Sequence, residues 1–240
     1  MLALIAMVAL LGALPAPAEV KAPAPVAKDL AARVVKFTPE AFMSAVEEDN
    51  LAVAGALLDA GMDINDPATL DKAYEKGHRE MMRLLLERGA NPNKGSLLAQ
   101  AAQKGEIEIV KMLLDHRADP NRGYPLVAAS RNGHIEVVKL LLEKRADANH
   151  EWPILGAAEN GHTQIVRILL ENGANPNTGR PLRLASAKGH GEIVRLLLKY
   201  GARHNSITNE YAGGGPLTVA RKNGRQVVVA ILKAAGAVED

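Results

Sequence analysis

Histidine is the residue type whose spacing in this chain could suggest metal chemistry. His78, His134, His162 and His190 occupy the same position of a pattern that repeats every 28 residues (162 − 134 and 190 − 162). Imidazole nitrogens bind a transition metal at about 2 Å, whereas helices packed side by side are about 8–10 Å apart. Side chains that recur once per repeat would therefore form a row and not a coordination sphere. We interpret these histidines as structural residues at the start of a helix, and we expect no metal site and no cofactor.

No other motif indicates catalysis. The glycines Gly213–Gly215 are followed by Pro216 and not by the Lys-Ser or Lys-Thr pair that ends a phosphate-binding loop. The G-x-S-x-G and H-E-x-x-H patterns of hydrolases are absent, and the chain has no cysteine to act as a nucleophile. Carboxylates such as Glu136 lie beside cations such as Lys139 and are interpreted as solvated helix faces. We therefore predict that the protein is not an enzyme, and we assign no catalytic residue.

The repeats determine where side chains can meet. An asparagine closes successive repeats at 28-residue intervals, at positions 65, 93, 121, 149, 177 and 205. A fixed period of about 20–50 residues is typical of a solenoid, in which each unit buries its apolar faces by stacking on its neighbours. A leucine-rich repeat also fits this period, but it requires a strand with leucines two residues apart before the asparagine. The apolar residues before these asparagines have helical spacing, so we predict a helix–turn–helix unit.

Residues 122–149 illustrate the expected pair of helices. Pro125 favours a first helical turn, where its missing N–H has no cost. After a turn at Gly133, Ile135, Val138 and Leu141 follow at helical spacing. Additional apolar residues widen this stripe, as expected of a helix packed between two neighbours.

This pattern resembles the ankyrin repeat. The family motif TPLHxAAxxGHxEVVxLLLxxGADVN is similar to PLVAASRNGHIEVVKLLLEKRADAN at 125–149 and to PLRLASAKGHGEIVRLLLKYGARHN at 181–205. The family period is about 33 residues, and the missing residues fall between the asparagine and the next proline, where the family forms a β-hairpin finger. The resemblance implies an all-α, ankyrin-type solenoid of about seven helix–turn–helix repeats with reduced hairpin loops. These repeats would span about 38–65, 66–93, 94–121, 122–149, 150–177, 178–205 and 206–240.

The N-terminal segment has the features of an export signal. An apolar run, Leu2–Leu14, is followed by Ala16-Pro17-Ala18, which has the small-x-small form of a cleavage site, although no Lys or Arg precedes the run. The run is shorter than the about 20 apolar residues of a spanning helix. We expect cleavage before Glu19 and a periplasmic or secreted protein, with an uncleaved N-terminal anchor as the alternative. The predicted domains are a signal peptide at 1–18, an Ala/Pro-rich linker with a short helix at 19–37, and the ankyrin repeat domain at 38–240.

Composition and charge narrow the class of partner. The chain is 48% apolar but only 3% aromatic, which suits stacked small helices. Its formal net charge of +2 is too small to favour nucleic acid or an anionic membrane. We expect a monomer that binds no nucleic acid and, once the signal is removed, no membrane.

The resemblance implies a scaffold that binds another protein on its concave face. Small bacterial ankyrin proteins with export signals, which this chain resembles most, are thought to support or protect periplasmic partners. The alternative is an inhibitor or immunity protein that blocks an exported toxin or enzyme. The sequence does not identify the partner.

The residue before each inner-helix proline marks the predicted contact surface. These residues are Tyr124, Trp152 and Arg180, which belong to the types enriched in binding hot spots. Alternatively, each of these side chains packs locally over the proline of the next repeat and caps its helix. We expect flanking contacts from Arg131, Asn132, Glu159, Asn160 and Lys188.

Backbone strain is predicted at two turns. A left-handed residue commonly follows a helix, and glycine adopts this conformation without steric cost. Four repeats have glycine at this position, but Arg117 and Arg145 occupy it in two others. If the turn is kept, both arginines must adopt positive φ.

Overall fold

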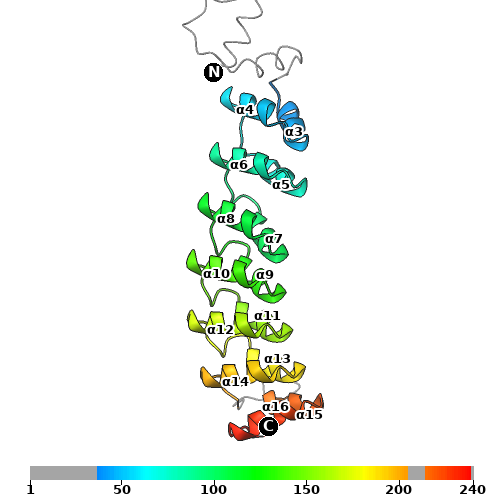
Figure 1. Cartoon of the computed structure of the whole chain (residues 1–240), viewed down its shortest axis with the longest axis vertical. Helices are drawn as coiled ribbons and strands as arrows, with labels where there is room; N and C mark the ends of the chain where they lie inside the picture. Colours follow the sequence, from blue (N-terminus) through cyan, green and yellow to red (C-terminus); the bar gives the residue numbers. More distant parts are fainter. Residues whose placement is uncertain (1–36, 205–213, 239–240) are drawn as a thin grey trace, which may run out of the picture. The chain divides into compact units, whose positions relative to one another are not determined.

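The computed structural model describes residues 37–204 and 214–238, and every regular element in these ranges is an α-helix (Figure 1). The predicted all-α class is therefore confirmed. The expected signal peptide and all of the expected linker except Phe37 lie outside the described residues. No helix in the described part of the chain is long and apolar enough to cross a membrane. The chain divides into two compact units, residues 1–97 and 98–240.

The helices follow one another in pairs, an inner helix and then an outer helix. The first unit contains α3 (Pro39–Glu47), α4 (Leu51–Asp59), α5 (Pro67–Glu75) and α6 (Arg79–Glu87). Helix α7 (Leu97–Lys104) begins at the last residue of the first unit. The helices that follow in the second unit are α8 (Ile107–Asp115), α9 (Pro125–Asn132), α10 (Ile135–Glu143), α11 (Pro153–Asn160), α12 (Thr163–Glu171), α13 (Pro181–Lys188), α14 (Gly191–Lys199), α15 (Pro216–Lys222) and α16 (Gln226–Ala234). Within the second unit, the inner helices α9, α11 and α13 lie in one column and the outer helices α10, α12 and α14 in another (Figure 1).

The outer helices are buried on two sides. Val137 and Val138 of α10 are 1% and 0% exposed although they are adjacent in sequence. Adjacent residues of a helix point about 100° apart, so the buried face of α10 is wide. Helix α10 indeed packs between α8 and α12. This arrangement explains the wide apolar stripe of the sequence.

The recurring histidines join consecutive repeats, which confirms their structural interpretation. Each ring donates a hydrogen bond from Nε2 to a backbone carbonyl. This carbonyl lies in the last turn of the inner helix of the preceding repeat. The pairs are His78 with Glu47 at 3.0 Å, His134 with Gln103 at 2.8 Å, His162 with Arg131 at 3.0 Å and His190 with Glu159 at 3.1 Å. A helix C-terminus leaves its last carbonyls without intrahelical donors. The histidine therefore satisfies one of these carbonyls while it fixes the spacing of the two repeats.

The asparagines that close the repeats form a second set of cross-repeat bonds, here called the asparagine ladder. In each case Oδ1 accepts a hydrogen bond from a backbone N–H 26 residues later. The ladder consists of Asn65 to Asn91 at 3.3 Å in the first unit, and Asn121 to Asp147 at 2.8 Å, Asn149 to Asn175 at 2.7 Å and Asn177 to Arg203 at 2.8 Å in the second. Asparagine suits this position because its amide both donates and accepts.

Strain occurs at the two predicted turns. Arg117 has a φ of 68° and Arg145 a φ of 67°, whereas the equivalent glycines lie between 85° and 96°. The conditional prediction of positive φ is confirmed. The links between repeats within the described residues are turns without strands, so the finger is reduced as expected.

In the second unit, the ion pairs between described residues lie on the outer helices and their C-caps. The predicted solvated pair of Glu136 and Lys139 has a separation of 3.0 Å. Lys144 bonds Asp115 of the preceding repeat, with 2.7 Å between Nζ and Oδ1. The hydrogen bond from Lys144 holds the pKa of Asp115 below its ordinary value, and the same bond raises the pKa of Lys144.

Candidate partner-binding surface

Three residues of the predicted row, Tyr124, Trp152 and Arg180, have the same unusual backbone conformation. Each is the N-cap of an inner helix that begins with proline, and each has left-handed φ and ψ: 61° and 46°, 60° and 59°, and 65° and 50°. Residues at an N-cap ordinarily lie in the extended region, and a non-glycine residue in the left-handed region costs about 1–2 kcal/mol. The short link turns the chain sharply into the proline, so the row combines large side chains with strained backbone.

The aromatic rings of the row are about half exposed. Tyr124 is 48% exposed and Trp152 is 45% exposed. The ring of Tyr124 lies against His150 of the following link, with 5.3 Å between ring centroids and an interplanar angle of 38°. Trp152 covers Gly179 of the next link so closely that a Cβ there would lie 3.2 Å from Cε3. Each ring thus packs on the next link and presents its remaining surface to solvent.

The flanking residues do not join this row. Arg131 and Asn132 end α9, Glu159 and Asn160 end α11, and Lys188 ends α13. An eight-residue helix is about 12 Å long, so the two sets lie at opposite ends of the same inner helices. The two rows mark the N-terminal and C-terminal ends of the inner helices, whose exposed side we call the inner-helix surface.

Two of the predicted contact residues also have a structural role. The Nδ2 group of Asn132 donates to the carbonyl of Ala128 at 2.8 Å, and that of Asn160 donates to the carbonyl of Gly156 at 2.9 Å. Each bond reaches back one turn within the same helix and ties the asparagine side chain to its own helix. Neither side chain is buried.

A packing position that the sequence did not reveal is Gly156. A Cβ at this residue would lie 2.9 Å from Cβ and 3.2 Å from Cα of Arg131. Glycine in mid-helix costs about 0.5–1 kcal/mol relative to alanine, and here it permits α9 to approach α11. The signal that could have found it is the glycine inside an otherwise helical pattern.

The repeat pattern agrees with a known family. The family model described as ankyrin repeats (3 copies) matches four overlapping windows, residues 70–152, 98–179, 126–208 and 154–239. Together these windows cover more than half of the chain, and their starts advance by the 28-residue period (98 − 70, 126 − 98 and 154 − 126). The chain belongs to the ankyrin repeat family. A search of curated proteins found no match.

Ankyrin repeats are generally modules of protein–protein interaction. The stacked inner helices supply the rigid support that such binding requires. The short links leave the row of Tyr124, Trp152 and Arg180 uncovered by fingers. In the part of this ankyrin chain that the structure describes, no group of three His, Asp or Glu side chains is close enough to hold a metal ion.

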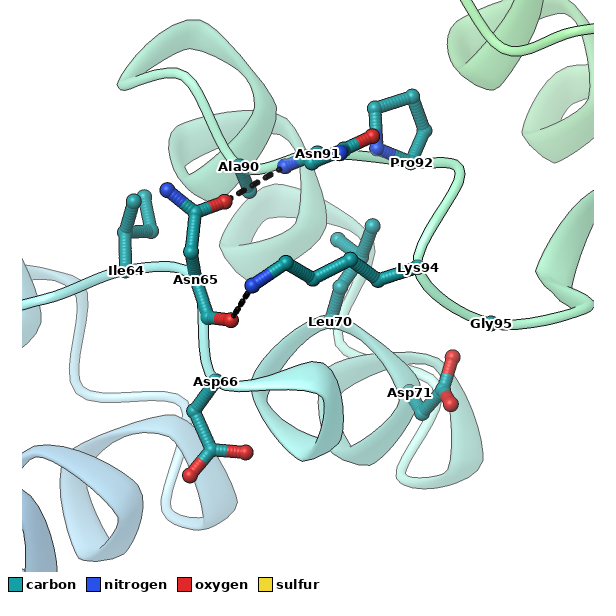
Figure 2. A pocket seen from close by; sticks show the side chains of 10 residues that line it. All are labelled: Ile64, Asn65, Asp66, Leu70, Asp71, Ala90, Asn91, Pro92, Lys94 and Gly95. Carbon is teal, nitrogen blue, oxygen red and sulfur yellow. Dashed lines mark hydrogen bonds between the residues drawn. The ribbon is translucent and has the colours of Figure 1, made fainter.

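A small pocket lies in the first unit of the ankyrin domain (Figure 2). Its volume of about 10 Å³ accommodates roughly one water molecule, far below the about 300–1,000 Å³ of a ligand site. Lys94 donates from Nζ to the carbonyl of Asn65, and the backbone N–H of Asn91 donates to Oδ1 of Asn65 at 3.3 Å (Figure 2). Burial raises the pKa of Asp71, and the nearby Glu75 adds to the effect. These contacts link two neighbouring repeats, so we assign the pocket to stacking.

Proposed function

We propose that this chain is a non-catalytic scaffold that binds a partner protein through the inner-helix surface of its second unit. The observation that carries the proposal is the row of large, exposed side chains held in left-handed backbone at Tyr124, Trp152 and Arg180. Strain of this kind costs stability and is concentrated at functional sites in proteins. Packing between repeats does not require an exposed tryptophan at this position, yet Trp152 is 45% exposed.

The dimensions of the row suit a protein partner. The inner helices α9, α11 and α13 pack consecutively, and packed helices are about 8–10 Å apart. The row therefore extends over roughly 20 Å. Tyrosine, tryptophan and arginine are the residues that most often dominate binding energy when they are desolvated in an interface.

We also propose that the protein acts in the periplasm or as a secreted protein after removal of residues 1–18. The support is the apolar run and the Ala16-Pro17-Ala18 motif of the sequence. Mass spectrometry of the exported protein should find Glu19 as the first residue. Full-length protein confined to the cytosol would contradict export, and full-length protein in the membrane fraction would indicate the uncleaved anchor.

Capture from a periplasmic extract of the source organism tests the binding surface. Wild type, Trp152→Ala and Tyr200→Ala are immobilised, and the retained proteins are compared by quantitative mass spectrometry. Tyr200 is the matched control because it is an aromatic residue, 38% exposed, at the end of the outer helix α14.

A retained partner should lose about 2 kcal/mol or more of binding free energy on Trp152→Ala in calorimetry and bind Tyr200→Ala normally. Unchanged affinity together with a large fall in melting temperature would make Trp152 structural and refute the proposed surface. The affinity separates the two functions: a single partner held at nanomolar strength or tighter would identify an inhibitor, and several weaker partners a scaffold.

A further inference from the structure

The two faces of the second unit differ in charge. The outer helices α8, α10, α12, α14 and α16 carry six basic and six acidic side chains, which balance. The inner helices α9, α11, α13 and α15 carry five basic side chains and one acidic side chain. The small net charge of the whole chain therefore conceals a basic inner-helix surface. The five cations are Arg131, Arg183, Lys188, Arg221 and Lys222.

Three of these cations are available to a partner. Arg131, Lys188 and Lys222 are exposed, and none takes part in an ion pair with another residue that the structure describes. They end α9, α13 and α15, which pack in sequence with α11 between the first two. At about 8–10 Å per step they span roughly 25–30 Å. Two cations of the outer helices, Lys139 and Arg195, are instead paired with glutamates of their own helices.

The inner helices also expose apolar side chains. The stem of Arg131 packs on Gly156, which fixes its base while the guanidinium reaches solvent. Val127 and Leu155, the third residues of α9 and α11, and Leu184 of α13 are partly exposed. The inner helices thus carry partly exposed apolar side chains together with positive charges at their C-terminal ends.

We infer that the inner-helix surface binds an acidic face of a partner protein, in which carboxylates surround a small apolar patch. This inference rests on the proposed function and names the chemical class of its partner. A protein fits better than a nucleic acid because Glu159 stands between Arg131 and Lys188. A continuous phosphate backbone would meet that carboxylate, whereas a folded protein can place a neutral or basic side chain opposite it. Complementary rim charges also accelerate association and exclude wrong partners.

Two variants with equal loss of charge test this inference. The inner triple variant is Arg131→Gln, Lys188→Gln and Lys222→Gln. The outer triple variant is Lys111→Gln, Arg167→Gln and Lys199→Gln, three exposed cations of the outer helices α8, α12 and α14. Thermal melting of both variants verifies that they remain folded.

Binding of fluorescent poly-L-glutamate is measured first, by anisotropy at low salt and at about 0.5 M salt. Each exposed cation is worth a factor of about two to three, so the inner triple variant should bind roughly tenfold more weakly than wild type at low salt. The outer triple variant should differ less than about twofold, and high salt should abolish the difference. An equal loss in both variants would overturn the inference, because the inner surface would then be no more attractive to acid than the outer.

Capture from nuclease-treated extract gives the second measurement. Proteins retained by wild type and by the outer triple variant, but lost from the inner triple variant, should be acidic. Basic proteins in this set, or capture that disappears with nuclease, would overturn the inference, the latter in favour of nucleic acid. A partner that requires Trp152 but not the three cations would preserve the proposed function and refute the acidic class alone. If the inner cations bind poly-L-glutamate but no captured protein depends on Trp152, the proposed function is refuted and the affinity of this surface for acidic groups is retained.

Discussion

Replacement of Arg145 by glycine should stabilise the protein. Arg145 has a φ of 67° in the turn after α10, where the next repeat has Gly173 at 85°. A residue with a Cβ loses about 1–2 kcal/mol in this region. Glycine avoids that cost but gives up about 0.5–1 kcal/mol more backbone entropy on folding. The difference predicts a gain of roughly 0.5–1 kcal/mol in the free energy of unfolding.

Two variants isolate the backbone contribution. Arg145→Ala removes the same side chain but retains Cβ, so it should not reproduce the gain. Gly173→Ala performs the reverse change in the neighbouring repeat and should cost about 1 kcal/mol. No atom lies within 4 Å of a Cβ placed on Gly173, so this loss cannot come from a collision.

Urea denaturation followed by circular dichroism measures these changes. The slopes of the transitions must agree between variants for the free energies to be compared. Repeats can unfold separately, so hydrogen exchange of α10 and α12 should show whether the change is local. If Arg145→Gly is no more stable than Arg145→Ala, or if Gly173→Ala costs nothing, then the left-handed turn does not determine stability here.

Three further substitutions test the contacts between repeats. Gly156→Ala places a methyl group 2.9 Å from Cβ of Arg131 and should lower the unfolding free energy by about 1–3 kcal/mol; an unchanged denaturation midpoint would mean that α9 can yield. Asn149→Ala leaves two backbone groups of the next repeat without their partner and should lower the unfolding free energy by about 1–3 kcal/mol. Asn149→Asp keeps the accepting oxygen, so an equal loss of unfolding free energy in this variant would show that the oxygen is unimportant. Because Lys144 lowers the pKa of Asp115, their pair stabilises the fold at neutral pH and loses its effect as the pH falls from about 4 through the lowered value. Melting of Asp115→Asn should therefore approach that of wild type in acid, and a difference that persists there would contradict the pairing.

The helix pairs were predictable because local and repeated signals coincide. Pro125 fixes the start of α9 through its own φ and its missing N–H, without reference to the rest of the chain. The helical spacing of Ile135, Val138 and Leu141 then specifies the buried side of α10. The histidines were assigned a structural role from helix spacing alone, and the carbonyl that each ring bonds became visible only with the repeats in place.

The candidate surface was less predictable. The sequence led us to expect that Arg131 flanks Tyr124, and the structure places these two residues at opposite ends of α9. Their separation follows from the length of the helix, which the pattern already contained. By contrast, the left-handed conformation of Trp152 depends on how a short link joins two packed helices, and no local preference of tryptophan favours it.

The amino-acid sequence by itself determined the repeat, the helical state of each segment and the two strained turns at Arg117 and Arg145, because each depends on a period or on the conformational range of one residue. Tertiary structure alone decided the contact between Gly156 and Arg131 and the packing of α9, α11 and α13 that brings charges of different repeats together. Those features arise when helices from different repeats are brought side by side. Stacking gathers residues that are 28 positions apart in the chain onto one surface, where their charges add.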